Sequence, residues 1–174
     1  LGSRQDHRLT HLRAALRDTF IGREARLGLG HGDIWSGNLF LSDGPDGTAQ
    51  LVGVVDWDTF RDDALAALDA CQLALTFRMD QTGEEYGPVL RSLLPDGTWR
   101  TEELAIFAAA GLEAELGNAV DPALRRGIIL LAWLRHVSTV LSQSENAARN
   151  RLWLFVNVER VLATALPASV KTEL

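Results

Sequence analysis

Apolar residues recur at intervals of three and four positions through most of this chain, and this period predicts helices. The first such stretch runs from about Arg4 to Phe20 and places Leu9, Leu12 and Leu16 on one face together with Phe20. We expect this face of the first helix to pack against the segments that follow.

The pattern changes between Leu27 and Val55, where the apolar residues come in short runs. Two runs, Asn38–Leu41 and Gln50–Val55, have the length of strands. Residues 42–47, which lie between them, read Ser-Asp-Gly-Pro-Asp-Gly, a composition that favours tight turns. The two runs are therefore predicted to form a β-hairpin.

After Asp58 every strong signal is helical. Two helices are marked by apolar residues at helical spacing, namely Leu65, Leu68, Cys71 and Leu75 in the first and Leu104, Ala108, Leu112 and Leu116 in the second. The pattern as a whole predicts an α+β fold that is predominantly helical.

Two more helices are predicted towards the end of the chain. Asp121 before Pro122 is a good N-cap followed by the residue favoured at the first helical position, and this helix should run to about Leu141. Its middle, residues 128–134, is apolar on nearly all sides, which indicates the buried centre of the domain. Ser142 and Glu145 have capping-box spacing before the last helix, which carries Leu152, Phe155, Val156, Leu162 and Leu166.

The composition predicts one compact domain over residues 4–174. The chain has 174 residues, 47% of them hydrophobic, and its first three residues, Leu1-Gly2-Ser3, are typical of a cloning scar, so we expect the native N-terminus to lie elsewhere. The longest apolar stretch, Gly127–Leu134, is too short to span a membrane. A net charge of −6 disfavours nucleic acid or an anionic membrane as partner, and the single cysteine, Cys71, suits the cytoplasm.

Candidate chemistry is concentrated in two short motifs. The first, at residues 31–38, reads His-Gly-Asp-Ile-Trp-Ser-Gly-Asn, and the second, at residues 54–58, reads Val-Val-Asp-Trp-Asp. The predicted hairpin brings Asp56, at the end of its second strand, beside Asn38 at the start of its first. Asp33 then offers a carboxylate to orient an acceptor hydroxyl, and Asn38 and Asp56 offer oxygen ligands for Mg²⁺, which are the groups that phosphoryl transfer needs.

Structural explanations exist for the same residues. Asp33 and Asn38 are also common in turns, Asp56 can cap a strand end, and His31 can be a buried hydrogen-bonding group. His7, His11 and His136 lack metal-ligand spacing, so no site is assigned to them. Cys71 lies on an apolar helical stripe and is expected to be an inert core residue.

The two motifs together resemble the catalytic segment of the aminoglycoside phosphotransferase and choline kinase family, whose fold is similar to that of protein kinases. The resemblance implies that Asp33 is the catalytic base, that Asn38 and Asp56 bind Mg²⁺, and that ATP is the phosphoryl donor. It also implies that His31 supports the loop, that Asp58 is an auxiliary metal ligand, and that Asp69 braces the catalytic loop from the next helix.

The chain departs from this family's pattern in one large respect, because it resembles only the C-terminal lobe. A family member has an N-terminal lobe with a nucleotide-covering loop and a strand lysine, whereas the only lysine here is Lys171. We expect the isolated chain to be inactive and its exposed lobe face to be apolar, which favours either the missing lobe or a homodimer as partner.

The acceptor is a small molecule with a hydroxyl group that the sequence does not identify. Aminoglycoside, choline-like amine, sugar and amino-acid alcohol all stay open, with residues 80–100 and the last helices expected to line the acceptor pocket. Two other functions also stay open. One is a non-catalytic interaction module on a kinase-lobe scaffold, and the other is a metal-dependent hydrolase that uses Asp33, Asp56 and His31.

Overall fold

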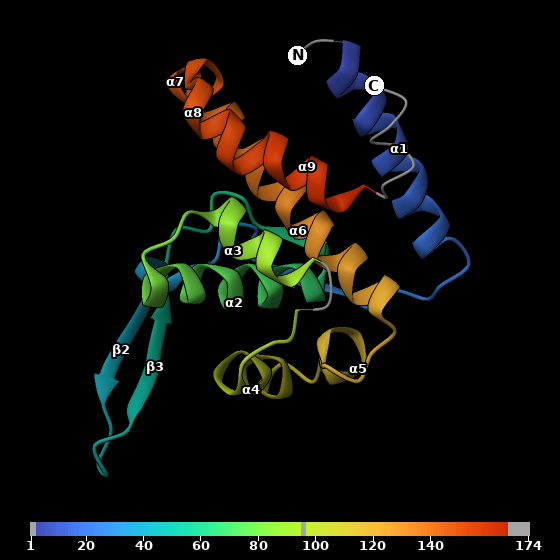
Figure 1. Ribbon diagram of the computed structural model, residues 1–174. Helices are drawn as coiled ribbons and strands as arrows, with labels where there is room; N and C mark the ends of the chain where they lie inside the picture. The colour runs from blue at the N-terminus through green and yellow to red at the C-terminus, as the bar shows by residue number, and fades with distance from the viewer. Residues whose placement is uncertain (1–2, 95–96, 167–174) are drawn as a thin grey trace.

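The computed structural model describes residues 3–94 and 97–166, and it is mostly helical with two small antiparallel sheets (Figure 1). The helices are α1 (Ser3–Phe20), α2 (Ala66–Thr82), α3 (Tyr86–Leu93), α4 (Thr101–Ala109), α5 (Glu113–Leu116), α6 (Pro122–Gln143), α7 (Glu145–Arg149), α8 (Arg151–Leu154) and α9 (Arg160–Ala165). The strands are β1 (Leu27–Gly30), β2 (Leu39–Asp43), β3 (Ala49–Val54) and β4 (Arg61–Leu65). A short 3₁₀ turn, η1 (Ser36–Asn38), precedes β2, and a π-helical segment, η2 (Phe155–Glu159), joins α8 to α9.

Helix α6 forms the centre of the helical body, as its apolar sequence predicts. It contacts α1, α2 and α3 (Figure 1). Ile129, Ala132 and Trp133 on it are fully enclosed. The predicted cap is confirmed, because an Asp121 carboxylate oxygen accepts a hydrogen bond from the Ala123 N–H at 3.0 Å and Pro122 occupies the first turn. The body is thus organised around one helix whose start and whose burial both follow from the sequence.

The predicted hairpin is confirmed as β2 and β3, which pair from Leu39 opposite Val54 to Asp43 opposite Ala49. A second pairing was not predicted. β1 pairs with β4 in antiparallel register, Leu27 opposite Leu65 and Gly30 opposite Arg61, so the expectation of only helices after Asp58 is wrong. Residues 61–63 of β4 are charged and exposed, so this strand lacks the alternation that marks a half-buried strand.

The segment from residue 80 to 116 contains more breaks than the periodicity suggested. The helix expected through Leu104 and Leu116 ends at Ala109, and α5 starts four residues later. Gly111 between them has φ +61°, a left-handed conformation that stops a helix. Helix α3, with Val89 and Leu90 fully buried, was not predicted.

The end of α6 also differs from its prediction. The residue that caps the following helix is Ser144, whose Oγ accepts a hydrogen bond from the Ala147 N–H at 3.2 Å, whereas the Ser142 hydroxyl donates to the Thr139 carbonyl. Capping-box spacing at Ser142 and Glu145 was therefore misleading.

The last predicted helix is interrupted by the wider turn of η2. This turn leaves the carbonyl oxygen of Asn157 free to accept a hydrogen bond from Trp133 Nε1 at 2.8 Å. The Asn157 side chain accepts a second bond from the Gly87 N–H at 2.8 Å. One buried asparagine thus joins the C-terminal helices to α6 and α3.

No helix in the described ranges is long and apolar enough to cross a membrane. Residues 1–2 of the expected cloning scar and Lys171 lie outside the described residues.

Candidate functional site

The first motif begins where β1 ends, and an aspartate from α2 holds its start. Asp69 Oδ2 accepts a hydrogen bond from the His31 N–H at 2.5 Å, and Asp69 Oδ1 accepts one from the Gly32 N–H at 3.2 Å. Arg135 of α6 forms an ion pair with the same carboxylate at 2.8 Å. The loop is therefore fixed to the two central helices through one side chain.

His31 joins the first motif to the second. It is only 3% exposed, and its Nε2 lies 2.7 Å from the Val55 carbonyl oxygen, so this nitrogen carries the proton and donates it. The other ring nitrogen, Nδ1, is then free to accept a bond from the Asp33 N–H at 3.4 Å. The Thr59 hydroxyl donates to the His31 carbonyl at 2.8 Å, and the Trp57 ring packs 4.6 Å from the imidazole. These contacts are those of a residue that positions the loop.

Asn38 connects the same two motifs at the base of the hairpin. Its side-chain Nδ2 donates to the Asp33 carbonyl at 3.0 Å, and its own carbonyl accepts a bond from the Val55 N–H at 3.0 Å. The side chain is held in place and 6% exposed, while its Oδ1 accepts no hydrogen bond from any described residue. Asp56 follows Val55 directly, so an amide oxygen and a carboxylate lie at the same corner of the hairpin.

Asp56 has an unusual backbone conformation. Its φ is +65°, and among the described residues it is the one non-glycine residue in this left-handed region. Such a conformation costs free energy in any residue with a side chain, and it recurs at functional sites. The Asp56 side chain is exposed and has no hydrogen bond or ion pair with a described residue. The same is true of Asp58, two positions on.

The Asp33 carboxylate is partly exposed and also has no hydrogen-bond partner in the described part of the chain. Its charge acts on His136 of α6, whose ring stacks on Tyr86 with centroids 4.0 Å apart. Burial lowers the pKa of His136, and the negative charge of Asp33 partly opposes this shift. Asp33 is therefore close to α6 as well as to the hairpin.

The side chains at this corner suit a hard cation. Carboxylate and amide oxygens are the ligands that Mg²⁺ prefers, and Mg²⁺ is commonly held by one or two carboxylates together with substrate phosphates. Asn38 Oδ1 and the Asp56 carboxylate fit this description. In the described ranges no three His, Cys, Asp or Glu side chains converge as a metal-holding group, so Asp33, Asp56 and Asp58 do not form a carboxylate cluster.

Several supporting residues were not found from the sequence. They are Arg135, Thr59 and Asp80, the last of which accepts a hydrogen bond from the Ser36 hydroxyl at 2.5 Å. Arg135 could have been singled out from the sequence, because a charged residue inside an apolar helix needs a partner. Thr59 gave no indication, since polar residues are common in loops, whereas Asp80 begins the segment that was expected to line the acceptor pocket.

An apolar cavity of about 520 Å³ lies beside the loop. Ile34 of the loop, Asp69, and Ile106 and Leu112 from α4 and its C-terminal connection line it. None of its lining residues comes from the segment 80–100, which was expected to line the acceptor pocket.

Comparison with known proteins places this chain in a family. The model of the phosphotransferase enzyme family matches residues 3–104, which is more than half of the chain. The chain belongs to the phosphotransferase enzyme family, as the resemblance of the two motifs predicted. No curated protein and no solved structure matches it.

Proposed function

We propose that this chain is the catalytic lobe of an ATP-dependent phosphotransferase that transfers a γ-phosphoryl group to a hydroxyl group of a small molecule. The observation that carries the proposal is the position of Asn38, which bonds to the Asp33 backbone through its side chain and to Val55, the neighbour of Asp56, through its carbonyl. One residue thus links the proposed base to the proposed metal ligand. The match to the phosphotransferase family supports the same reaction class.

Asp33 is the proposed base. Its carboxylate has no hydrogen-bond partner within residues 3–94 and 97–166, so it is available to accept a hydrogen bond from an acceptor hydroxyl and to hold that oxygen in line with the phosphorus atom. His31 and Asp69 fix the backbone on either side of the loop's start. This fixation matters because phosphoryl transfer depends mainly on positioning and electrostatics.

Asn38 and Asp56 are the proposed ligands for Mg²⁺, with Asp58 as an auxiliary ligand. When bound, Mg²⁺ would neutralise charge on the phosphates of ATP. The Asn38 amide is orientated for this role by its bond to the Asp33 carbonyl, which leaves Oδ1 as the free atom. The left-handed backbone at Asp56 turns the chain at this point and sets the direction of its carboxylate.

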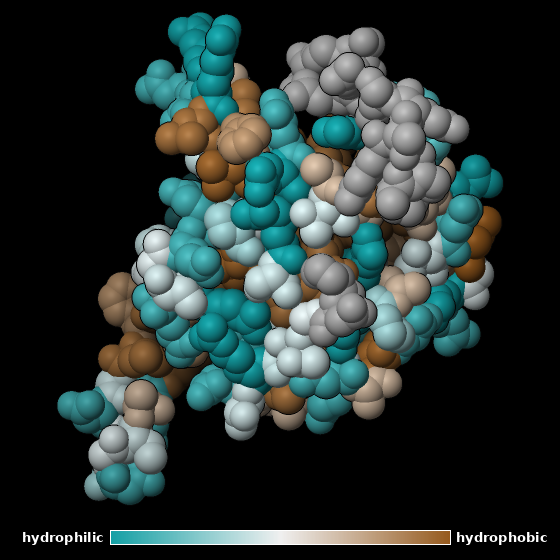
Figure 2. All heavy atoms as spheres, in the orientation of Figure 1, coloured by the Kyte–Doolittle hydropathy of each residue, from teal (hydrophilic) through white to brown (hydrophobic). Residues whose placement is uncertain are grey.

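The surface of the hairpin supports the proposal that a nucleotide-binding lobe completes the site. Phe40 and Leu41 of β2 and Leu51 and Val52 of β3 are each more than half exposed. Figure 2 shows apolar atoms gathered where the hairpin leaves the body. Contiguous apolar surface of this kind is typical of an interface. We propose that a second lobe, or a second copy of the chain where that lobe is lacking, covers it.

The test is phosphoryl transfer from labelled ATP to a panel of aminoglycosides, amino alcohols and sugars, with the chain joined to a nucleotide-binding lobe. Asp33→Asn should lower kcat by about 10² to 10⁴-fold, the usual contribution of a general base, with little change in nucleotide binding. Asp56→Asn should instead weaken Mg²⁺-dependent nucleotide binding.

Thr48→Ala, a change at the far tip of the hairpin, is the matched control and should alter neither quantity. Full turnover by Asp33→Asn would refute the base assignment. Mg²⁺-independent or absent nucleotide binding would favour the non-catalytic module, and phosphate release without ATP would favour the hydrolase.

A further inference from the structure

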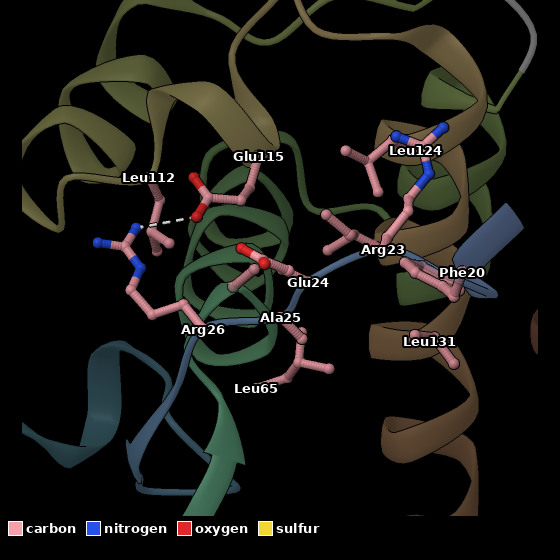
Figure 3. Close-up of a pocket in the computed structure, with 12 residues that line it drawn as sticks. Phe20, Arg23, Glu24, Ala25, Arg26, Leu65, Leu112, Glu115, Leu124 and Leu131 are labelled. Atoms are coloured by element: carbon pink, nitrogen blue, oxygen red, sulfur yellow. Dashed lines mark hydrogen bonds and ion pairs between the residues drawn. The ribbon is translucent and has the colours of Figure 1, made fainter.

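A second cavity lies at the opposite end of β1 from the catalytic loop. It has a volume of about 620 Å³ and lies where the connection from α1 to β1 meets α5 and α6 (Figure 3). Its walls are mainly apolar and include Phe20, Leu65, Leu112, Leu124, Ile128 and Leu131. This volume is within the range of small-molecule sites. The loop that carries Asp33 begins beyond the other end of β1, and Leu112 lies between this cavity and the one beside that loop, since it lines both.

The two arginines at this cavity are already engaged. Arg23 donates to an Asp121 carboxylate oxygen at 2.8 Å and to the Thr19 carbonyl at 2.8 Å. Arg26 pairs with Glu115 Oε1 at 3.1 Å and also donates to the Gly111 carbonyl. The charge of each guanidinium is therefore already paired with a carboxylate.

The two carboxylates at this cavity have fewer hydrogen-bond partners than the arginines. Glu24 has no hydrogen bond or ion pair with any described residue, and Glu115 Oε2 is buried without a hydrogen-bond partner. In Figure 3 the Glu24 and Glu115 side chains lie on one side of the cavity, and Phe20 and Leu131 lie on the other. A buried acceptor without a partner costs free energy, and a donor from a ligand would recover it after a rotation of the carboxyl group.

We propose that this cavity binds a small organic cation, an ammonium group on an apolar body. The apolar part would lie against Leu124, Ile128 and Leu131, and the ammonium group would donate to Glu24 and Glu115. Asp121, which is outside the lining, pairs with Arg23, so the two lining glutamates are opposed by one further arginine, Arg26, and the local charge favours a cation. The proposal is independent of the phosphotransferase reaction.

The experiment uses n-hexylammonium as probe, with hexanol and hexanoate as controls of equal length, and follows the methyl NMR signals of the chain. We expect saturable shifts at Leu124, Ile128 and Leu131, with half-saturation by the amine at a concentration at least tenfold lower than by either control. Selective binding of the amine at these methyl groups supports the site. Equal binding of all three probes, or shifts elsewhere only, would overturn it.

A matched pair of variants tests the charge directly. Glu24→Gln should weaken hexylammonium binding about fivefold, whereas Glu102→Gln, an exposed glutamate at the start of α4, should leave it unchanged. Both positions are exposed, so both variants should fold, which methyl spectra without ligand will check. If the two variants bind hexylammonium as the unsubstituted chain does, Glu24 is not a ligand contact and the proposal fails.

Discussion

The helical body and the hairpin with its loops differ in the burial of their apolar side chains and in the strain of their backbone. In the body, Trp133, Phe107 and Leu75 are enclosed by their neighbours, and Asn157 links three helices by buried hydrogen bonds. In the hairpin, large apolar side chains face solvent, and Asp56 holds a strained backbone conformation. The body therefore provides the stability, while the hairpin and its loops keep exposed and costly features that contribute little to it.

The sharpest test of this comparison is the same substitution in both regions. Phe107→Ala removes a ring that is 0% exposed and packs against Trp99, so it should lower the free energy of unfolding by about 3 to 5 kcal/mol. Phe40→Ala removes a ring that is 55% exposed and should cost less than about 1 kcal/mol. Urea unfolding monitored by circular dichroism measures both, and similar losses would remove the distinction between the regions.

The junction between the two regions should be sensitive as well. Asp69→Asn removes the charge that pairs with Arg135 and accepts the loop N–H groups, so it should cost about 1.5 to 3 kcal/mol. The amide signals of His31 and Gly32 should shift at the same time. Asp63→Asn, which breaks only an exposed ion pair with Arg61, is the control and should leave stability unchanged. An undisturbed loop in Asp69→Asn would show that other contacts position it.

The left-handed backbone at Asp56 predicts that a substitution at this position can raise the free energy of unfolding rather than lower it. Asp56→Gly relieves the left-handed backbone and should raise stability by up to about 1 kcal/mol, although the greater freedom of glycine in the unfolded chain offsets part of the gain. Asp58→Gly lacks this relief and should lower stability by about 0.5 kcal/mol. Thermal and urea unfolding of the pair measure the difference, and a clear loss in Asp56→Gly would contradict the strain argument.

The smallest expected effect concerns His136 and the way in which the free energy of unfolding depends on pH. Burial lowers its pKa below the ordinary value of 6.5, so the unfolded chain binds this proton at a higher pH than the folded chain. The stability that the neutral His136 ring contributes is fully present above pH 6.5. It is lost as the pH falls through the pKa of His136 in the folded chain. Tyr86 stacks on the ring, and of the two charges that act on its pKa, Asp33 opposes the shift and Arg135 adds to it.

His136→Gln should therefore lose less stability between pH 7.5 and pH 5.5 than the unsubstituted chain. His11→Gln is the comparison, because His11 is on α1 and contacts His7 near the surface. Urea unfolding at the two pH values gives the slopes. The same slope in His136→Gln as in the unsubstituted chain would contradict this assignment.

Local sequence patterns predicted the ends of helices best where no neighbouring residue competes for the same capping role. Asp121 with Pro122 gave the start of α6, and the dense turn residues between the two apolar runs gave the hairpin. The same reasoning failed at Ser142, because a nearby Ser144 competes for the same cap. It also failed at Gly111, where one left-handed residue divides a helix that the apolar spacing would continue.

The candidate site was predicted only as residue types in an order. The sequence indicated Asp33, Asn38 and Asp56, but not that His31 Nε2 would bond to Val55 or that Arg135 would reach Asp69. These contacts join residues far apart in the chain, 38 positions in the case of His31 and Asp69. No local spacing encodes such a distance.

By itself, the sequence determined the helical body, the hairpin and the two motifs, because each depends on a period, a cap or a turn within a few neighbouring residues. The tertiary structure alone decided that β1 pairs with β4, that Arg135 of α6 pairs with the aspartate that holds the loop, and that an apolar cavity with two carboxylates lies at the far end of β1. These features depend on which distant surfaces meet, and that is set by how the whole chain buries its apolar faces.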